Sequence, residues 1–121
     1  MSLEITWQIQ LLLNNGDLKD QFSSSSIAAD QAVQGAFRNT FLVPIAYAAL
    51  GIGDLAAPGV GIFQNLDDTN YVQVGIEVAA TFYPFLTLLP GEADFVRVAT
   101  STLFAQSNLA PTRLFYILYE S

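Results

Sequence analysis

The sequence predicts an all-β protein, an antiparallel β-sandwich of jelly-roll-like kind built from about eight short strands. Segments that alternate apolar and polar residues recur at spacings of about ten residues, and turns rich in Gly, Pro, Asn and Asp separate them. No segment carries the apolar periodicity of a long helix. A small barrel would show the same rhythm. We expect a single domain over residues 1–121, with an extended arm or loop at 18–40.

The first strand is expected at residues 3–11, where LEITWQIQL alternates apolar and polar positions. A turn follows at 14–17 (NNGD), because Asn and Gly adopt positive φ at low cost. Residues 18–40 are the least regular part of the chain. The serine run at 23–26 fits a loop or an edge strand, and its last serine could cap a short helix to about residue 33. An irregular arm is the alternative for this region.

From residue 41 onward the sequence predicts closely linked strands. Pro44 restricts the first of them to an edge or an entry position. Asx side chains favour a turn at 66–70, and Pro90-Gly91 suits the centre of a type II turn. The remaining strands are expected at 46–52, 60–65, 71–78, 82–89, 95–99, 102–106 and 112–120.

The last predicted strand is apolar on both faces. Leu114, Tyr116 and Leu118 alternate with Phe115, Ile117 and Tyr119. A strand with one face in water shows polar residues at alternate positions. The second face is therefore expected to be covered, either by the arm at 18–40 or by a neighbouring subunit, and the sequence leaves both open.

The composition points to assembly. Hydrophobic residues make up 52% of the chain and charged residues 12%, against a usual charged share of about 25%. Apolar surface that a small domain cannot bury commonly ends in an interface. We expect a homo-oligomer or a part of a larger structure. The net charge of −7 and only four cationic residues argue against nucleic-acid and membrane partners.

The chain contains no cysteine and no histidine. These absences exclude a disulfide framework, a thiol nucleophile and an imidazole base or ligand. The start of the chain lacks the basic region of a signal peptide. The longest apolar run, 41–52, falls short of the roughly 20 residues of a spanning helix. We expect a soluble protein made in the cytoplasm.

Two arrangements have a loose similarity to catalytic sites. Lys19 precedes the serines at 23–26, as in a Ser–Lys pair. Glu92 and Asp94 flank a turn, as a carboxylate pair could. A solvated loop and an ordinary polar turn explain both patterns more simply. We expect no catalytic residue, no cofactor site and no enzymatic activity.

Three groups of residues are candidates for binding sites. Asp67, Asp68 and Asn70, with Asp54 in another turn, are the oxygen ligands that calcium takes, but their spacing is not that of an EF-hand. The sequence favours turn stabilisation over a metal site. The glycines at 51, 53, 59 and 61 do not form a phosphate loop, because no Lys-Ser or Lys-Thr pair follows them. Aromatic residues that could stack on a sugar are Trp7, Tyr47, Tyr71, Tyr83, Tyr116 and Tyr119. Core or interface positions are the commoner use of such residues.

The second half of the chain resembles small virion structural proteins of tailed bacteriophages. The resemblance rests on an N-L-D-x-T-N-[YF]-V-x-[IV]-G signature at 65–75, an L-x-P-G-E turn at 88–92 and an aromatic closing strand. It covers residues 45–121, and residues 1–44 contribute little.

The resemblance implies a virion component, made in the host cytoplasm. The first expectation is a capsid decoration or cement protein that stabilises the head by contacts with the major capsid protein. A tail, fibre or connector component is the alternative. A carbohydrate-binding β module that uses the tyrosines is the alternative from another class.

Overall fold

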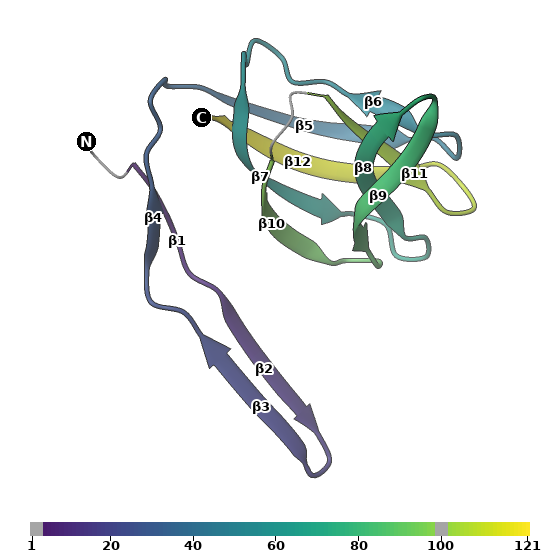
Figure 1. Ribbon diagram of the computed structural model, residues 1–121. Helices are drawn as coiled ribbons and strands as arrows, with labels where there is room; N and C mark the ends of the chain where they lie inside the picture. The colour runs from purple at the N-terminus through teal and green to yellow at the C-terminus, as the bar shows by residue number, and fades with distance from the viewer. Residues whose placement is uncertain (1–3, 99–101) are drawn as a thin grey trace. The chain divides into compact units, whose positions relative to one another are not determined.

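The computed structural model describes residues 4–98 and 102–121, and its regular elements there are all antiparallel β-strands (Figure 1). The all-β antiparallel prediction is confirmed. The short helix considered for residues 26–33 is wrong, because Ile27–Ala29 is a strand. By its internal contacts the chain divides into two compact units, Met1–Val33 and Gln34–Ser121.

The first unit consists of two pairs of strands. β1 (Ile5–Trp7) pairs with β4 (Ile27–Ala29), and β2 (Gln10–Asn15) pairs with β3 (Leu18–Ser23). The strand predicted at 3–11 is therefore interrupted, because its two halves take different partners; Leu3 lies outside the described residues. Ile9 and Ser24 join the two pairs: the Ser24 N–H donates to the Ile9 carbonyl at 2.9 Å, and the Ile9 N–H donates to Ser24 Oγ.

The β2–β3 hairpin closes through Gly16 and Asp17. Gly16 has a φ of +59°, whereas Asp17 keeps a negative φ. Positive φ at the first central residue alone defines a type II′ turn, which matches the twist of the flanking strands. The turn predicted from NNGD is confirmed, with both asparagines lying in the strand.

The second unit contains two four-stranded sheets. The first has the order β10-β7-β12-β5 and the second has the order β6-β11-β8-β9. The strands are β5 (Ala36–Val43), β6 (Ala48–Leu50), β7 (Pro58–Asn65), β8 (Val72–Val78), β9 (Thr81–Leu88), β10 (Ala93–Arg97), β11 (Leu103–Ser107) and β12 (Thr112–Glu120).

One hydrophobic core lies between these two sheets. The first sheet contributes Phe63 and Tyr116, whose rings stack with centroids 6.1 Å apart. The Tyr116 hydroxyl donates to the Gly51 carbonyl at 2.7 Å, so its polar atom is satisfied inside the core. The remaining core residues are Val43, Leu50, Leu55, Val72, Val74, Leu88, Val98, Leu103, Ala105, Leu114 and Leu118. The packing of the two sheets is sandwich-like.

The region predicted as an arm at 18–40 belongs to both units. Residues 18–33 lie in the first unit, while β5 begins at Ala36 and pairs with β12 along its whole length. Apolar and polar residues do not alternate regularly along β5, because the polar Asn39 occupies an inward position between Phe37 and Phe41. Asn39 Nδ2 lies 3.4 Å from the Tyr116 hydroxyl, which accounts for a polar residue there.

The β8–β9 hairpin contains two backbone irregularities. Its register shifts between Val74 and Gly75, and a Cβ on Gly75 would overlap the Tyr83 carbonyl oxygen. The turn residues Ala79 and Ala80 have φ values of 51° and 63°, a type I′ geometry that Asn and Gly adopt more easily.

Candidate assembly surfaces

The outward side of the first sheet brings together all three arginines of the chain. In the register, Arg38 lies opposite Ile117, Arg113 opposite Leu42, and Arg97 opposite Val60. Directly opposed residues share one face of a sheet, and all three arginines are exposed. We call this surface the arginine face. Its other strand positions are Ala36, Thr40, Ile62, Gln64, Ala93, Phe95, Phe115 and Tyr119, none of them acidic.

The arginine face includes the second apolar side predicted for the last strand. Ile117 is only 8% exposed, and Phe115 and Tyr119 are half-buried. The Arg38 guanidinium carbon stands 5.9 Å from the Phe115 ring centroid, a cation–π distance. Arg38, on the neighbouring strand β5 of the same sheet, therefore covers part of the Phe115 ring. Leu42, next to Arg113, remains 58% exposed.

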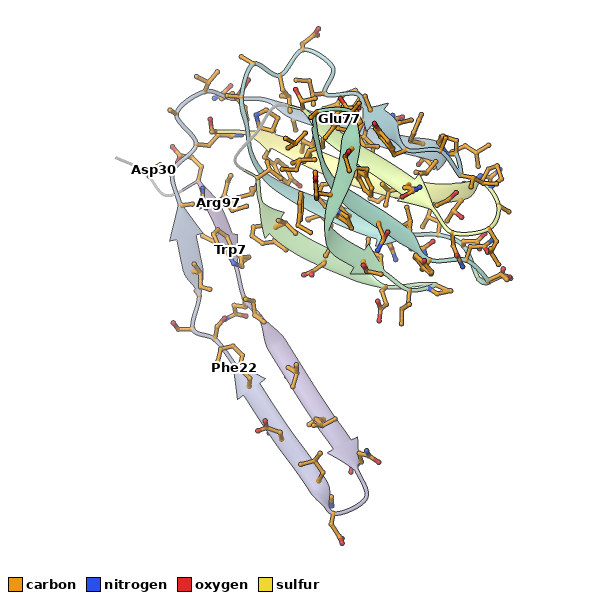
Figure 2. All side chains as sticks on the ribbon, turned by 45° about the vertical axis from the view of Figure 1, so that its right-hand side comes forward. Trp7, Phe22, Asp30, Glu77 and Arg97 are labelled. Atoms are coloured by element: carbon orange, nitrogen blue, oxygen red, sulfur yellow. The ribbon has the colours of Figure 1, made fainter. Side chains whose placement is uncertain are left out.

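The β2–β3 hairpin carries a second apolar surface. Leu11 faces Phe22, Leu13 faces Asp20, and Asn15 faces Leu18, so these six side chains share one side of the ribbon. The four apolar members are 39% to 59% exposed, and Figure 2 labels Phe22 on β3. We call Leu11, Leu13, Leu18 and Phe22 the hairpin apolar face. A two-stranded hairpin alone is marginally stable in water.

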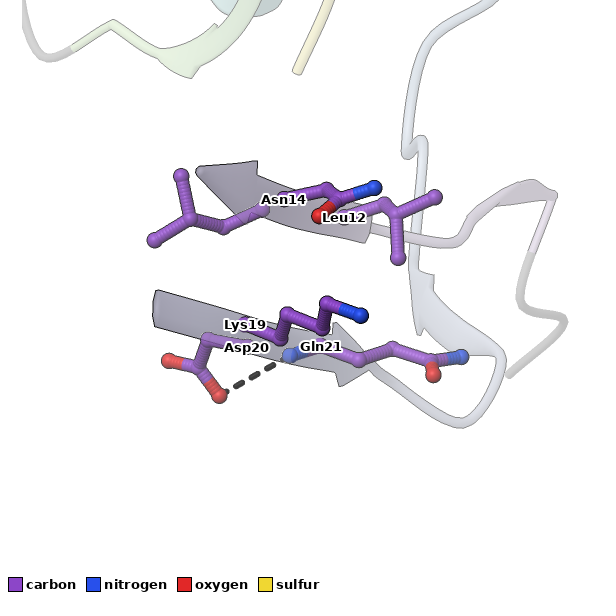
Figure 3. Close-up of a pocket in the computed structure, with 6 residues that line it drawn as sticks. Leu12, Asn14, Lys19, Asp20 and Gln21 are labelled. Carbon is purple, nitrogen blue, oxygen red and sulfur yellow. Dashed lines mark hydrogen bonds between the residues drawn. The ribbon is translucent and has the colours of Figure 1, made fainter. Parts of the chain in front are cut away.

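The opposite side of the hairpin is more polar. Leu12 faces Gln21 and Asn14 faces Lys19. A shallow hollow of about 410 Å³ lies along the hairpin (Figure 3), and residues from both sides of the ribbon line it: Leu12, Leu13, Asn14, Lys19, Asp20 and Gln21. All of these residues are exposed, and Asp20 Oδ1 accepts a hydrogen bond from the Gln21 N–H at 2.8 Å. The hollow lacks the enclosure and the convergent polar groups of a ligand site.

The outward side of the second sheet holds an aromatic cluster. The Tyr47 ring stacks on Phe82 at 5.5 Å and meets Phe104 edge-on at 5.7 Å. The Tyr47 hydroxyl donates to Glu77 Oε2 at 2.7 Å, and this hydrogen bond raises the pKa of Tyr47 above 10.0. Tyr47 is thereby held in a packed cluster.

The tyrosines considered for sugar stacking do not form one surface. Tyr116 is buried in the core and Tyr119 belongs to the arginine face. Tyr83 is exposed on β9, and Tyr47 lies in the cluster on the second sheet. Trp7 belongs to the first unit. Burial removes Tyr116 from any sugar-stacking surface, and the carbohydrate-binding alternative stays a prediction.

The acidic turn considered for calcium is organised by its own hydrogen bonds. Asp67 Oδ2 accepts from the Asn70 N–H at 2.6 Å and from the Thr69 N–H at 3.0 Å, and these bonds hold the pKa of Asp67 below 3.8. The fully buried Asn65 donates to the Asn70 and Leu88 carbonyls and accepts from the Asp67 N–H. Among the described residues, no group of three acidic side chains is placed to hold a metal ion.

The other sequence candidates also have local structural roles. Glu92 Oε1 accepts from the Leu89 N–H at 2.8 Å, and Gly91 has the positive φ of a type II turn, which confirms that prediction. Asp94 Oδ1 accepts from the next residue's N–H. In the candidate Ser–Lys pair, Ser24 Oγ accepts a hydrogen bond from the Ile9 N–H, while Lys19 lies opposite Asn14 in the hairpin.

The sequence reading missed Glu120. This residue is 7% exposed, and its carboxylate accepts from the Ala56 N–H at 2.9 Å and the Ala57 N–H at 2.6 Å. Both bonds lower the pKa of Glu120 below 4.5. An acid at the end of an aromatic strand gives no local sign of partners more than sixty residues away.

Over the described ranges there is no helix with the length and apolar character needed to cross a bilayer. Comparison with protein-family models, with curated proteins and with solved structures found no match for the chain. The resemblance of residues 45–121 to phage virion proteins therefore stays a prediction.

Proposed function

We propose that this protein is a structural subunit of a tailed-bacteriophage virion, and that it acts as a capsid decoration or cement protein without enzymatic activity. The main support for the proposal is the exposure of the hairpin apolar face. Four large side chains stand exposed on one side of a ribbon that is two strands wide. Such a surface is typical of a subunit whose final environment is an assembly.

The distribution of charge is consistent with this role. The chain has a net charge of −7 and a low total charge content. An acidic subunit suits the outside of a head, away from packaged DNA. The capsid partner would be the major capsid protein, which offers many equivalent docking positions.

We further propose that Gln34–Ser121 is a jelly roll. Numbered one to eight along this unit, its strands lie in the order six-three-eight-one in the first sheet and two-seven-four-five in the second. Two four-stranded sheets that interleave early and late strands in this way correspond to two Greek keys. Viral capsid domains use the jelly roll widely, which supports the proposed setting.

The test uses capsids that lack the protein. Adding the purified chain is expected to raise the temperature at which these capsids disrupt, as followed by light scattering and electron microscopy. The double variant Leu11→Asp/Phe22→Asp should lose this effect, whereas Leu12→Asp, on the opposite side of the hairpin, should retain it.

Unchanged capsid stability with wild-type protein would contradict the cement role. Gold-labelled antibody on whole virions gives a second readout, because label confined to tails or fibres would replace the head assignment by the tail alternative.

A further inference from the structure

We propose that the hairpin apolar face of one copy docks on the arginine face of a second copy. The contact is thus between two different surfaces of the same chain. This proposal deepens the assembly role proposed above and rests on it, and it identifies which surfaces meet.

The charges of the two surfaces are complementary. The arginine face exposes Arg38 and Arg113 around apolar side chains and has no acid at its strand positions. Its partner must therefore combine carboxylates with apolar groups. The hairpin apolar face has this combination, because Asp20 lies directly opposite Leu13 and Asp17 forms the adjoining turn. The hairpin's cation, Lys19, points to the other side.

The dimensions of the two surfaces also agree. The hairpin is two strands wide and six residue pairs long, while the β5–β12 pair runs for eight residue pairs. At roughly 3.4 Å per residue these lengths are about 20 Å and about 27 Å. Two sheets that stack face to face lie about 10 Å apart with interdigitated side chains. The leucines of the hairpin would cover Leu42 and Phe115, with Asp20 within reach of the flanking arginines.

A contact between unlike surfaces has a definite consequence for assembly. A pair of copies joined in this way still presents one free hairpin and one free arginine face, so growth continues until a ring closes or an open filament forms. Pairing of identical surfaces would instead stop at a dimer. The two cases are separable by mixing variants.

The experiment measures self-association of purified full-length protein by sedimentation over a concentration series. The hairpin variant is Leu11→Arg/Phe22→Arg, and the acceptor variant is Arg38→Glu/Arg113→Glu. Each is expected to weaken self-association by about tenfold or more, because like charges would meet at the contact. Leu12→Arg is the matched control, since Leu12 is 77% exposed on the other side of the same ribbon.

Mixing the two defective variants tests the geometry. Each retains the surface that the other lacks, so the mixture should associate more strongly than either variant alone. Adding Asp20→Arg to the acceptor variant should restore its self-association, because the reversed charges match again. Near-UV circular dichroism of every variant confirms that the aromatic core is folded.

Several outcomes would overturn the proposal. Wild-type protein that stays monomeric over the series is one, and equal loss in the Leu12→Arg control is another. Undiminished association of the acceptor variant would mean that hairpins pair with each other. Hairpin amides already protected from exchange in dilute monomer would mean docking within one chain. Capsid binding is measured separately, so failure of self-association is distinguishable from failure of the cement role and leaves that role standing.

Discussion

Single side chains fix the loops of this protein by accepting or donating backbone hydrogen bonds. Asp67 accepts the backbone N–H groups of Thr69 and Asn70, and Glu120 accepts those of Ala56 and Ala57. Asn65 satisfies two carbonyls and one N–H. The turn role of Asp67 was predictable because its partners follow within three residues. The roles of Asn65 toward Leu88 and of Glu120 toward Ala56 were not, because folding alone brings those segments together.

The pH dependence of stability should reflect the two carboxylates. The pKa of Asp67 lies below its usual 3.8 and that of Glu120 below its usual 4.5, because backbone N–H groups favour the charged forms. A lowered folded-state pKa contributes stability above the unfolded-state value, and this contribution is lost as pH falls through the folded value. Thermal midpoints should therefore fall as the pH drops below about 4.5. Asp67→Asn and Glu120→Gln should each make the fall of the thermal midpoint at acid pH less steep. An unchanged fall in both variants would contradict the role given to these carboxylates.

Gly75 is required by the bulge in β8–β9. A methyl group there would overlap the Tyr83 carbonyl oxygen and the Pro84 Cα, both of them backbone atoms. Gly75→Ala should lower the free energy of unfolding by about 1–3 kcal/mol, as overpacking usually does. Gly51→Ala is the control, because its new Cβ would meet only the Tyr116 hydroxyl at 3.9 Å. Urea titration of both variants measures the difference, and equal stabilities would exclude the clash.

Among the elements, strands with regular alternation were predictable and irregular ones were not. β8 and β12 lie close to their predicted bounds. β5 was missed at its start because its inward Asn39 and outward Ala36 hide the alternation. The strand predicted at 95–99 is observed as β10, Ala93–Arg97, and residue 99 lies outside the described ranges.

The two ends of β8 differ in burial, although both alternate cleanly in the sequence. Val74 is fully buried in the core, whereas Ile76, beyond the bulge, is 37% exposed. Val74→Asp should abolish cooperative folding, because an unpaired carboxylate would enter the core. Ile76→Asp should leave a folded protein, with a loss of about 1 kcal/mol or less. Near-UV circular dichroism and urea titration distinguish the two, and equal damage would place Ile76 in the core.

At the scale of the whole molecule, the division into two units could not be read from the sequence. Alternation predicts that residues 3–11 form a strand but not which strand pairs with it. Sheet order depends on contacts between segments that are distant in sequence. The two strands that pair with β12, β5 and β7, both precede it by many residues in the chain. The candidate surfaces likewise emerge only from the register.

The second unit should fold without the first. All residues of the shared core lie between Val43 and Leu118. A fragment comprising 34–121 is expected to unfold cooperatively in urea and to keep the near-UV signal of Tyr116 and Phe63, because their packing lies within this unit. A non-cooperative transition without near-UV signal would show that residues 1–33 are needed to complete the core.

The β2–β3 hairpin also exposes its backbone. Because β2 and β3 pair only with each other in the described structure, each keeps one edge whose N–H and C=O groups are not paired with another strand. Such edges template pairing with further chains, and apolar side chains on the same ribbon strengthen the tendency toward aggregation. Lys19 and Asp20 are the only charges within these two strands, and they act as gatekeepers. Neutralising them would make the purified chain prone to fibrillar aggregation during storage, a risk that the proposed docking of the hairpin would remove.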